Sequence, residues 1–418
     1  MTAAPIGRIF PSTMKGNLQP DHRSAIVDLL HDRGALSRGD LAELSGLSPA
    51  TVSRALASLL RSGLVEEGEA AGEGPGRPAR SVELCPGGAL VVGIDAGGSM
   101  LRAVLADMVG TVKRRVASPA RDPRDAALLV ADLADLVRAA IDDADPVRVL
   151  AVAAGISGIV DHAAGRVRMS PDLPGLDGVD LAALLSAELR IPVEIDNDDL
   201  LAAVGEAAAG AARGSGDVVF LSLGYGLGAG ILVDGRPVRG AAHAAGAIGS
   251  LGAPALDERA SGRAIPGRYL AALARTGRAG GQARAGGTAL AGGQALDARA
   301  VFERADAGDP VASAIVADVV ASVAEVATAV AALVDPSVIV LGGGLAAGRP
   351  RLVDAVAEHL AGSVPFPPRV VPSALEGAAV AHGAIALALA HVRSHLPDPS
   401  GGDHPPLRAR RRTALQLA

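Results

Sequence analysis

Apolar positions near the start of the chain recur with the spacing of a helix rather than a strand. They predict three short helices over residues 21–33, 38–45 and 49–62. Ser48 followed by Pro49 is typical of a helix start, because serine caps free backbone N–H groups and proline lacks an N–H that would go unbonded. The apolar faces of these helices would consist of Ala25, Ile26, Leu29, Leu30, Leu41, Leu44, Val52, Leu56, Leu59 and Leu60.

Two strand-like segments follow the three helices. LVEEGEA and RSVEL, both within residues 64–84, flank a glycine-rich tip and predict a β-hairpin. Three helices followed by a hairpin are the layout of a winged helix-turn-helix, which we place at residues 21–84. Residues 1–20 contain three prolines and no helical period, so we expect a flexible arm there. Residues 85–88, with the sequence CPGG, are the expected linker.

Beyond the linker, apolar runs typical of buried strands alternate with helical segments. This alternation predicts an α/β architecture with mostly parallel central strands. We expect a first lobe over residues 90–205, completed by a helix near 376–392, and a second lobe with a dimerisation surface over 206–375. The low-complexity segment 276–295 would be a surface loop, and residues 393–418 a disordered basic tail. The expected strands are 89–98, 100–107, 112–118, 149–157, 192–196, 218–224, 228–235 and 337–344, and the expected helices are 124–141, 181–189, 199–212 and 310–334.

Composition narrows the possible functions. Aromatic residues make up 1% of the 418 residues and tryptophan is absent, which argues against base-stacking platforms for single-stranded nucleic acid. The single cysteine, Cys85, excludes intrachain disulfides and multi-cysteine zinc sites and fits a reducing compartment. No run of about 18 uninterrupted apolar residues appears, so we expect a cytoplasmic protein without membrane contact. The net charge of −6 gives nucleic-acid binding no support at the level of the whole molecule.

Three apolar strands end in glycine-rich turns. GIDAGGS begins at Gly93, LGYGLGAG at Leu223 and VLGGG at Val340. Glycines let backbone N–H groups approach phosphate oxygens, and a nearby carboxylate can position a metal. A glycine-rich hairpin turn is the alternative for the first segment. Three such strand ends in one α/β chain, together with an Asn-Asp pair at 197–198, follow the order found in the actin-like sugar-kinase fold.

In these motifs the chain resembles the ROK family, which groups bacterial repressors, open reading frames and sugar kinases. The likeness extends over roughly residues 20–390, and the winged helix-turn-helix resembles the repressor branch. The resemblance implies a two-lobed actin-like fold behind the DNA-binding module. The matching segments are GIDAGGS near 93, SPDLPGLDGVDLAALL near 170, EIDNDD near 194, LGYGLGAGILVDG near 223, ASGRAI near 260, AGDPVA near 307 and VDPSVIVLGGGLA near 334.

The resemblance also implies roles for particular residues. Asn197 and Asp198 stand at the sugar-binding and catalytic-base positions, where a carboxylate would remove the proton of an attacking sugar hydroxyl. Asp172 stands where family kinases usually have asparagine, and Asp257 aligns with a sugar-contacting glutamate, so we expect all four to bind a ligand. Helix capping is the alternative role of the Asn197-Asp198 pair. The vestigial phosphate loops would comprise Asp95, Gly97, Gly98, Gly224, Gly226, Gly228, Gly342 and Gly343.

Departures from the family pattern argue against catalysis. The AGExGH segment appears here as AGAIGS, so Ala247 and Ser250 replace the glutamate and histidine that hold the sugar and a zinc. The cysteine-rich zinc segment is missing, so we expect no metal and no cofactor. Tyr225 replaces a small hydroxyl residue in the second loop and could fill the nucleotide space, and Met100 replaces a polar residue. His243 is either a substitute ligand or, as we prefer, a loop residue.

The DNA-binding prediction rests on the third helix and the wing. Side chains at the start and outer face of the helix would reach base edges or phosphates in the major groove, and arginines flank the wing tip. A winged-helix protein-interaction domain is the alternative, because residues 1–82 hold nine basic and nine acidic residues. The candidate DNA-binding residues are Ser48, Thr51, Ser53, Arg54, Arg77 and Arg80.

Taken together, the sequence predicts a DNA-binding transcriptional regulator, a repressor of carbohydrate-related genes. Its partners would be a double-stranded operator and a sugar-like effector, and it would assemble as a homodimer or homotetramer. The kinase-like body would act as effector sensor and dimerisation scaffold rather than as an enzyme. Two alternatives stay open: an active sugar kinase that uses Asp198 as its base, and a ligand-independent regulator whose body only oligomerises.

Overall fold

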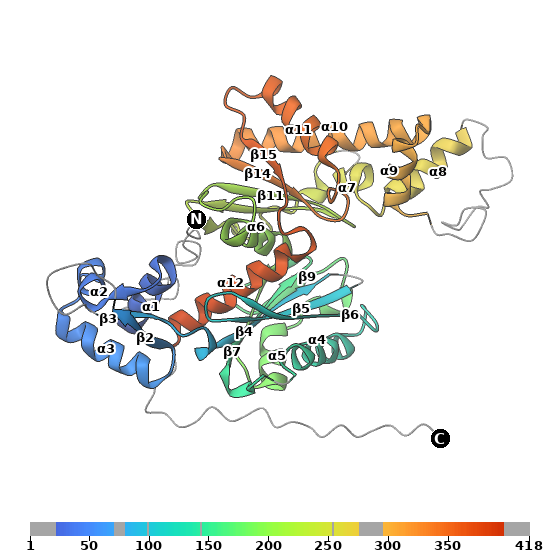
Figure 1. Ribbon diagram of the computed structural model, residues 1–418. Helices are drawn as coiled ribbons and strands as arrows, with labels where there is room; N and C mark the ends of the chain where they lie inside the picture. The colour runs from blue at the N-terminus through green and yellow to red at the C-terminus, as the bar shows by residue number, and fades with distance from the viewer. Residues whose placement is uncertain are drawn as a thin grey trace, which may run out of the picture.

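The structure is a computed structural model, and it describes residues 22–70, 80–97, 100–142, 144–252, 255–275 and 296–396. It has an N-terminal module followed by a body with two β-sheets (Figure 1). The expected arm at 1–20 and the expected loop at 276–295 lie outside the described residues, as do Arg77, Gly98 and most of the expected basic tail.

The N-terminal module is a winged helix-turn-helix, as the sequence predicts. Its three helices pack together, and strand β3 pairs with β2 to form the wing. A short strand that the sequence analysis missed, β1, pairs with the other edge of β3. The elements are α1 (His22–Arg33), β1 (Leu36–Ser37), α2 (Arg38–Ser45), α3 (Pro49–Arg61), β2 (Val65–Ala70) and β3 (Arg80–Leu84).

Capping residues fix the starts of the second and third helices. Ser37 and Asp40 form a reciprocal capping box at α2. The Ser48 hydroxyl accepts a hydrogen bond from the backbone N–H of Thr51 at 3.2 Å, and Pro49 occupies the first turn of α3. Most of the predicted apolar positions are buried or partly buried, but Leu44 is 44% exposed, because it lies on the outer side of the short helix α2.

The first lobe is built on a five-stranded sheet with the order β10-β7-β4-β5-β6. Strand β4 pairs parallel with β7, and β7 pairs parallel with β10, whereas β5 is antiparallel to both of its neighbours. Between β7 and β10 along the chain, β8 and β9 form a separate two-stranded antiparallel ribbon. The strands are β4 (Leu90–Ala96), β5 (Met100–Asp107), β6 (Val112–Pro119), β7 (Val149–Ile156), β8 (Ile159–Asp161), β9 (Arg166–Met169) and β10 (Val193–Asn197).

The second lobe is built on another five-stranded sheet, with the order β13-β12-β11-β14-β15. Strands β11, β14 and β15 are parallel, β12 pairs antiparallel with β11, and β13 pairs antiparallel with β12. The strands are β11 (Val218–Leu223), β12 (Leu227–Val233), β13 (Arg236–Pro237), β14 (Val338–Gly342) and β15 (Arg369–Pro372).

The two sheets are mixed, so the expectation of mostly parallel strands was wrong. Each sheet has two parallel and two antiparallel pairings. The reason is the length of the connections: β4, β5 and β6 follow one another through short turns, and such turns can join only antiparallel neighbours. The helical crossovers that parallel pairing requires begin later in the chain, at α4.

Helices cover both faces of each sheet. Successive residues of β4 point to opposite faces: Val92 and Ile94 pack in the same cluster as α4, and Val91 packs in the cluster that contains α12. The longer helices of the body are α4 (Ala126–Ile141), α5 (Leu181–Leu189), α6 (Asp198–Ala209), α8 (Ile265–Arg275), α9 (Ala298–Asp306), α10 (Pro310–Val334), α11 (Pro350–Ser363) and α12 (Ala379–Ser394), and α7 (Leu256–Ala260) is a single turn.

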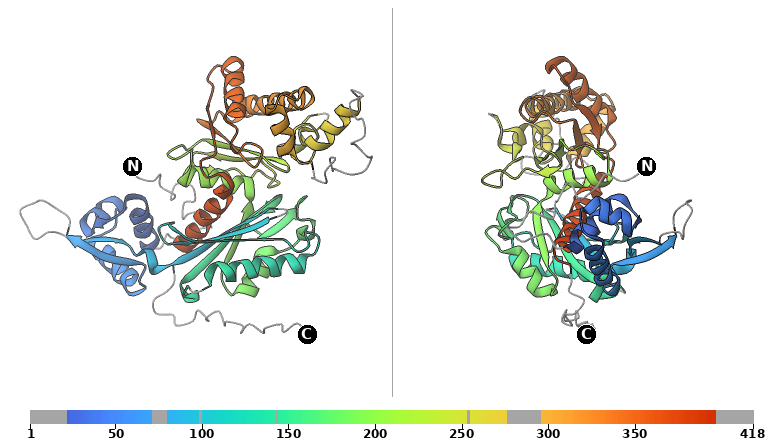
Figure 2. Two further views of the ribbon diagram at one scale, coloured as in Figure 1. Left: turned by 45° about the vertical axis from the view of Figure 1, so that its right-hand side comes forward. Right: turned by 90° about the vertical axis from the view of Figure 1, so that its left-hand side faces the viewer.

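Two of these helices, α6 and α12, lie between the two sheets (Figures 1 and 2). Helix α6 packs against β7 of the first sheet and against β11 and β12 of the second, and α12 packs along α6. Glycines allow this close approach, because a Cβ on Gly205 would overlap the backbone of Ala379 and one on Gly383 would overlap the backbone of Leu201. The two helices therefore form one packed unit that joins the lobes.

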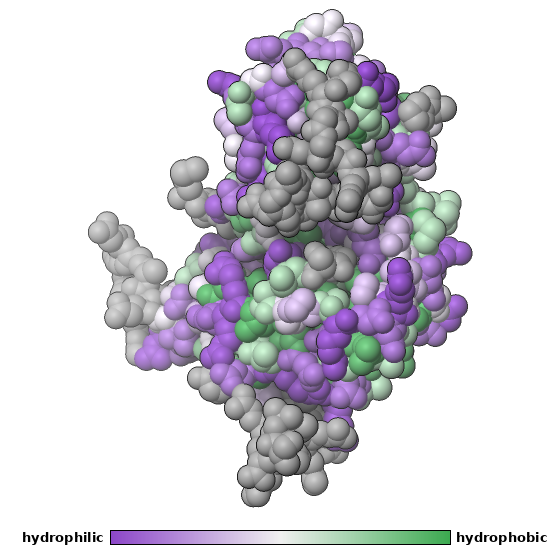
Figure 3. Space-filling view, turned by 90° about the vertical axis from the view of Figure 1, so that its right-hand side faces the viewer, coloured by the Kyte–Doolittle hydropathy of each residue, from purple (hydrophilic) through white to green (hydrophobic). Residues whose placement is uncertain are grey.

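Helix α10 is long and apolar enough, by length and composition, to cross a membrane. It packs against α7, α8, α9 and α11, and two of its acidic residues form ion pairs with these neighbours: Asp318 with Arg268 of α8, and Glu325 with Arg259 of α7. The face in Figure 3 carries polar side chains over both lobes with small apolar groups between them. The packing and ion pairs of α10 are typical of a core helix, and one such helix is weak evidence for a membrane span.

The winged helix-turn-helix docks against the far end of α12. Arg393, which is 2% exposed, forms an ion pair with Asp28 of α1 at 2.9 Å, and Arg23 donates a hydrogen bond to the backbone of Leu396. The expected linker is a short turn bonded to both parts of the chain. Cys85 N donates to the Leu64 carbonyl of the winged helix-turn-helix, and Met108 N of the first lobe donates to the Pro86 carbonyl. Helix α12 therefore contacts both the winged helix-turn-helix and α6.

Candidate functional site

A cavity of about 450 Å³ opens between the lobes. The carboxyl ends of three strands meet there: β7 leads to Ser157, β10 ends at Asn197, and β11 leads to Gly224. This is the edge of an open α/β sheet where ligands usually bind. The four residues expected to bind a ligand all line this cavity; they are Asp172, Asn197, Asp198 and Asp257.

Asn197 both caps α6 and faces the cavity. Its amide oxygen accepts a hydrogen bond from Leu200 N at 2.8 Å, so the capping role considered from the sequence is present. Its amide nitrogen donates to the Gly158 carbonyl at 2.8 Å and to the Asp198 carboxylate at 3.1 Å. Asp172 accepts a hydrogen bond from the Ser157 hydroxyl at 2.8 Å. The local contacts thus fix these side chains at the cavity wall.

Burial dominates the electrostatics of the two aspartates that begin α6. Desolvation, followed by repulsion from Asp199 and Asp95, raises the pKa of Asp198 well above its ordinary value. Desolvation also raises the pKa of Asp199 to about 6, although a hydrogen bond with Ser222 opposes the shift. Because the two groups interact, they titrate as a pair. Such carboxyl groups can accept or donate hydrogen bonds to a ligand hydroxyl near neutral pH.

Asp257 reaches the cavity with both carboxylate oxygens already engaged. One oxygen accepts a hydrogen bond from Leu227 N at 2.9 Å, and the other forms an ion pair with Arg263 at 2.6 Å. The side chain therefore ties α7 to the turn between β11 and β12. Its expected contact with a ligand stays a prediction.

The expected phosphate loops divide into two groups. Gly97, Gly224, Gly226 and Gly228 line the cavity, whereas Gly342 and Gly343 do not. At Gly342 a Cβ would overlap the Phe220 ring, and Gly343 has a φ of 85° and packs on the backbone of Leu223. The glycines after β14 thus have a packing reason to be glycine. Asp95, near the end of β4 and close to Gly97, is buried, and desolvation raises its pKa against the opposing charge of Arg102 at 3.2 Å.

Tyr225 does not fill the cavity. The side chain lines it but is 65% exposed, because the turn between β11 and β12 directs the phenol towards solvent. The expectation that this residue could occupy the nucleotide space stays a prediction. Met100, by contrast, is half-buried at the start of β5.

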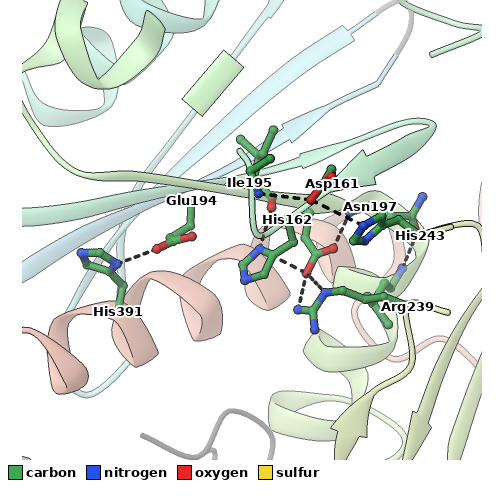
Figure 4. A network of polar contacts seen from close by, with 11 residues as sticks. Asp161, His162, Glu194, Ile195, Asn197, Arg239, His243 and His391 are labelled. Atoms are coloured by element: carbon green, nitrogen blue, oxygen red, sulfur yellow. Dashed lines mark hydrogen bonds and ion pairs between the residues drawn. The ribbon is translucent and has the colours of Figure 1, made fainter. Parts of the chain in front are cut away.

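The sequence analysis missed the way in which the segment after β13 is held. Arg239, in that segment, binds Asp196 of β10 through Nε at 3.0 Å and Nη2 at 2.6 Å, and Asp196 is 1% exposed. His162 Nδ1 donates a hydrogen bond to the Ile195 carbonyl of the same strand at 2.9 Å, and His243 faces Asp161 at 3.5 Å (Figure 4). Arg239 and Asp196 lie 43 positions apart, so the sequence could not predict that they pair. The one indication was an arginine in a segment made mostly of glycine and alanine.

Ala247 and Ser250, which replace the family's glutamate and histidine, both line the cavity. Within the described ranges no group of three or more His, Cys, Asp or Glu side chains is arranged to hold a metal ion. The loop is instead held by backbone hydrogen bonds, including Ala229 N to the Gly246 carbonyl at 2.9 Å.

A second candidate surface is the outer face of α3. Ser48, Ser53 and Arg54 are exposed, and Thr51 is half-buried with its hydroxyl bonded to that of Ser48 at 2.9 Å. Arg80 extends from the wing stem and forms an ion pair with Glu67 at 3.0 Å. Arg77, which was expected to flank the wing tip, lies outside the described residues. The face therefore holds a compact set of hydrogen-bond donors on an unobstructed helix.

A winged helix-turn-helix joined to a two-lobed body with a cleft between lobes defines a regulator-like member of the actin-like sugar-kinase fold. Comparison with known proteins makes the assignment definite: the ROK family model matches residues 91–391, well over half of the chain, and the MarR family model matches residues 20–74. The chain belongs to the ROK family.

Individual relatives include both repressors and kinases. A xylose repressor from Caldicellulosiruptor bescii is 30% identical over 235 residues, covering 56% of this chain and 58% of the repressor. The chain thus matches little more than half of that relative's length. A ROK family transcriptional regulator, homologous to the E. coli MLC protein, has the same fold (TM-score 0.75, 22% identity, 91% of this chain and 99% of that chain). A Streptomyces griseus glucokinase, in complex with glucose and AMPPNP, has a TM-score of 0.59 at 25% identity, covering 72% of this chain and 99% of that chain.

Proposed function

We propose that this protein is a sugar-responsive, DNA-binding transcriptional repressor whose kinase-like body senses its effector without phosphorylating it. The observation that carries the proposal is the cleft: it keeps Asp172, Asn197 and Asp198 at its wall but has Ala247 and Ser250 where the family's sugar- and zinc-binding side chains stand. Its volume of about 450 Å³ lies within the range of small-molecule sites.

The N-terminal module supplies the DNA-binding half of the proposal. The exposed start of α3 presents Ser48, Ser53 and Arg54 in the way that recognition helices approach the major groove. The partner would be a double-stranded operator, and a homodimer or homotetramer would place two such helices on its half-sites. Similarity to xylose repressors supports repression and a carbohydrate effector, and a reducing cytoplasm suits the single half-buried Cys85.

The packed unit of α6 and α12 offers a route from the cleft to the DNA. Helix α6 begins at Asp198 in the cleft, α12 packs along it, and α12 reaches α1 through Arg393 and Asp28. A ligand that binds one arrangement of the lobes more tightly would shift the population towards that arrangement. The docked winged helices would then change their spacing and lose the operator.

An active sugar kinase is the second candidate, and one observation favours it. Asp198 lies in the cleft at the position that the family resemblance gives to the catalytic base, and burial raises the pKa of its carboxyl, which makes the carboxylate a stronger base. Against it stand Ala247 and Ser250, because phosphoryl transfer requires the sugar hydroxyl and the triphosphate to be held in line.

Two measurements test the proposal. A coupled assay with ATP and D-xylose, D-glucose or N-acetyl-D-glucosamine should show no sugar-dependent turnover, whereas turnover that Asp198→Asn removes would establish the kinase. A thermal-shift screen with the same sugars should raise the midpoint of unfolding, since a ligand that binds only the folded state stabilises it. Absence of any shift would favour a ligand-independent regulator.

A further inference from the structure

The loop that follows β13 is anchored to both lobes. At one end Arg239 binds the buried Asp196 of the first lobe, and Ala245 N closes the loop on the Arg239 carbonyl at 3.1 Å. At the other end Gly246 lies so close to β12 that a Cβ would overlap the Ala229 carbonyl. The residues between these anchors are therefore held in one conformation at the edge of the cavity.

His243, between the anchors, has a φ of 59°. The left-handed region costs an L-residue free energy relative to glycine, and a side chain persists there only where its surroundings impose it. The other residues of this loop that line the cavity are Ala244, Ala245, Gly246 and Ala247. Among these cavity-lining loop residues, His243 is therefore the one whose side chain can form hydrogen bonds.

The imidazole of His243 lacks a good partner among the described residues. Nδ1 is buried and makes no hydrogen bond, and Nε2 lies 3.5 Å from the Asp161 carboxylate, beyond ordinary hydrogen-bond length. Packing rather than hydrogen bonding thus holds the ring, which is 23% exposed at the cavity (Figure 4). Because Nδ1 has almost no accessible surface, a ligand hydroxyl in the cavity would reach the ring through Nε2, which the long contact with Asp161 leaves without a close hydrogen bond.

We infer that His243 is a specificity-determining residue of the effector site, where its ring hydrogen-bonds a hydroxyl of an uncharged sugar. It would supply from this loop the polar contact that Ala247 and Ser250 cannot make. The remaining charges of the wall disfavour an anionic ligand such as a sugar phosphate, because Asp172, Asp198 and Asp199 are acidic and Arg263 is paired with Asp257. This inference rests on the proposed sensor function and deepens it.

Three variants and one control test the assignment on the full chain. His243→Gly removes both the ring and the backbone strain, His243→Ala removes the ring alone, and His243→Asn keeps a hydrogen-bonding side chain that tolerates the left-handed region. Arg190→Gly is the matched control, because Arg190 has a φ of 57° at the exposed end of α5, away from the cavity. Calorimetry would measure the Kd for D-xylose, D-glucose, N-acetyl-D-glucosamine and D-glucose 6-phosphate, and thermal denaturation would measure Tm without ligand.

We expect the wild-type protein to bind one of the uncharged sugars and to bind the phosphate ester more weakly. His243→Gly and His243→Ala should then weaken the Kd of that sugar about 10-fold or more, with His243→Asn recovering most of the loss. The unliganded Tm of His243→Gly should equal or exceed that of the wild type, as for Arg190→Gly.

Three results would overturn the inference. His243→Gly could bind the sugar as tightly as the wild type does, which would make the residue a loop element only. A weakened Kd that accompanies a lower Tm and is not restored by asparagine would make its role structural. If no uncharged sugar bound the wild-type protein, the proposed function itself would fail, and this inference with it.

Discussion

Asp198 and Asp199 occupy the first turn of α6, where the helix dipole favours negative charge. Burial nevertheless raises both pKa values, that of Asp199 to about 6, so desolvation outweighs the dipole at this position. Ionising either carboxyl in the cleft therefore costs free energy, which hydrogen bonds from a ligand would offset. Carboxyl groups in a cleft whose pKa values are shifted by burial are typical of binding sites.

Asp199→Asn should stabilise the protein at neutral pH. An acid whose pKa is raised on folding loses stability as pH rises from its unfolded value near 4 to its folded value near 6, because the unfolded chain ionises first. Removing the charge should raise the free energy of unfolding at pH 7 by about 1–3 kcal/mol and flatten that decline. Denaturant titrations between pH 4 and 7 measure both effects.

Asp180 provides the contrast for that experiment. A hydrogen bond from Arg166 lowers the pKa of this exposed carboxyl, so it gains from being charged. Asp180→Asn should therefore not stabilise the protein at pH 7. Equal effects of the two substitutions would mean that burial does not control the charge state of the cleft.

Arg54→Ala should weaken operator binding by about 1–3 kcal/mol if the side chain reads a base. Arg54 is exposed in the second turn of α3, which begins after the Ser48 cap. Fluorescence anisotropy at fixed salt, with operator DNA recovered from the protein's own genome, measures the loss, and Arg190→Ala on the body is the control. Unchanged affinity in both Arg54→Ala and Thr51→Ala would contradict the assignment of α3 as the recognition helix.

At the residue scale the sequence predicted local chemistry well and long-range contacts poorly. The Ser48-Pro49 helix start and the placement of Asn197 at a strand end follow from neighbouring residues alone. The partner of Asp257 and the exposure of Tyr225 depend on how α7 and the β11–β12 turn pack. The strain at His243 depends on anchors in both lobes, and nothing in its immediate sequence reveals them.

At the element scale, the contact of α6 with α12 decides how the lobes are joined. Gly383 lies against the backbone of Leu201, and Glu206 of α6 accepts hydrogen bonds from Ala374 N at 3.3 Å and Leu375 N at 3.1 Å, just before α12. These contacts leave little freedom between the two helices. A change of lobe arrangement should therefore move them together.

Gly383→Ala should push the helices apart and lower the free energy of unfolding by about 1–3 kcal/mol, the usual cost of overpacking a core. Chemical denaturation measures the change. Gly377→Ala is the matched control, because a Cβ at Gly377 would meet no atom within 4 Å. Similar stability of the two variants would show that the helices are not in the close contact described.

Most elements were predictable because their periodicity and end signals are local. The strands from 90 to 119 and the long helix from Asp309-Pro310 to Val334 are examples. The antiparallel pairing of β5 was missed although the short connections already required it. Strand β1 and the ribbon of β8 and β9 were missed because segments of two to four residues carry too little periodicity.

At the scale of the whole molecule, an ion pair of the buried Arg393 joins the winged helix-turn-helix to the body. Arg393 and Asp28 lie far apart in sequence, so no pattern along the chain could predict their contact. Besides its bond to Asp28, the guanidinium makes no hydrogen bond through either terminal nitrogen to the described residues. Desolvation lowers the pKa of Arg393, while Asp28 and Asp32 oppose the shift. The buried guanidinium therefore depends on these carboxylates to compensate its charge.

Asp28→Asn should undock the winged helix-turn-helix from α12, because it removes the charge that compensates a buried cation, at a cost of up to about 3 kcal/mol. Limited proteolysis near the 85–88 turn reports undocking. The double variant Asp28→Leu with Arg393→Met should recover most of the loss, since apolar replacement of a buried pair is often neutral. If the single variant were as resistant as the wild type, the pair would not hold the module.

The central claim is that a sugar in the cleft releases DNA without being phosphorylated, and operator release measures it most directly. The full chain, bound to its operator, would be titrated with D-xylose, D-glucose and N-acetyl-D-glucosamine in the presence of ATP, while DNA release and ADP are followed together. We predict that one sugar releases the wild-type protein with no ADP formed, and that Asp198→Asn stays bound at the same concentration. Sugar-dependent ADP formation, or equal release of the Asp198→Asn protein, would contradict the account.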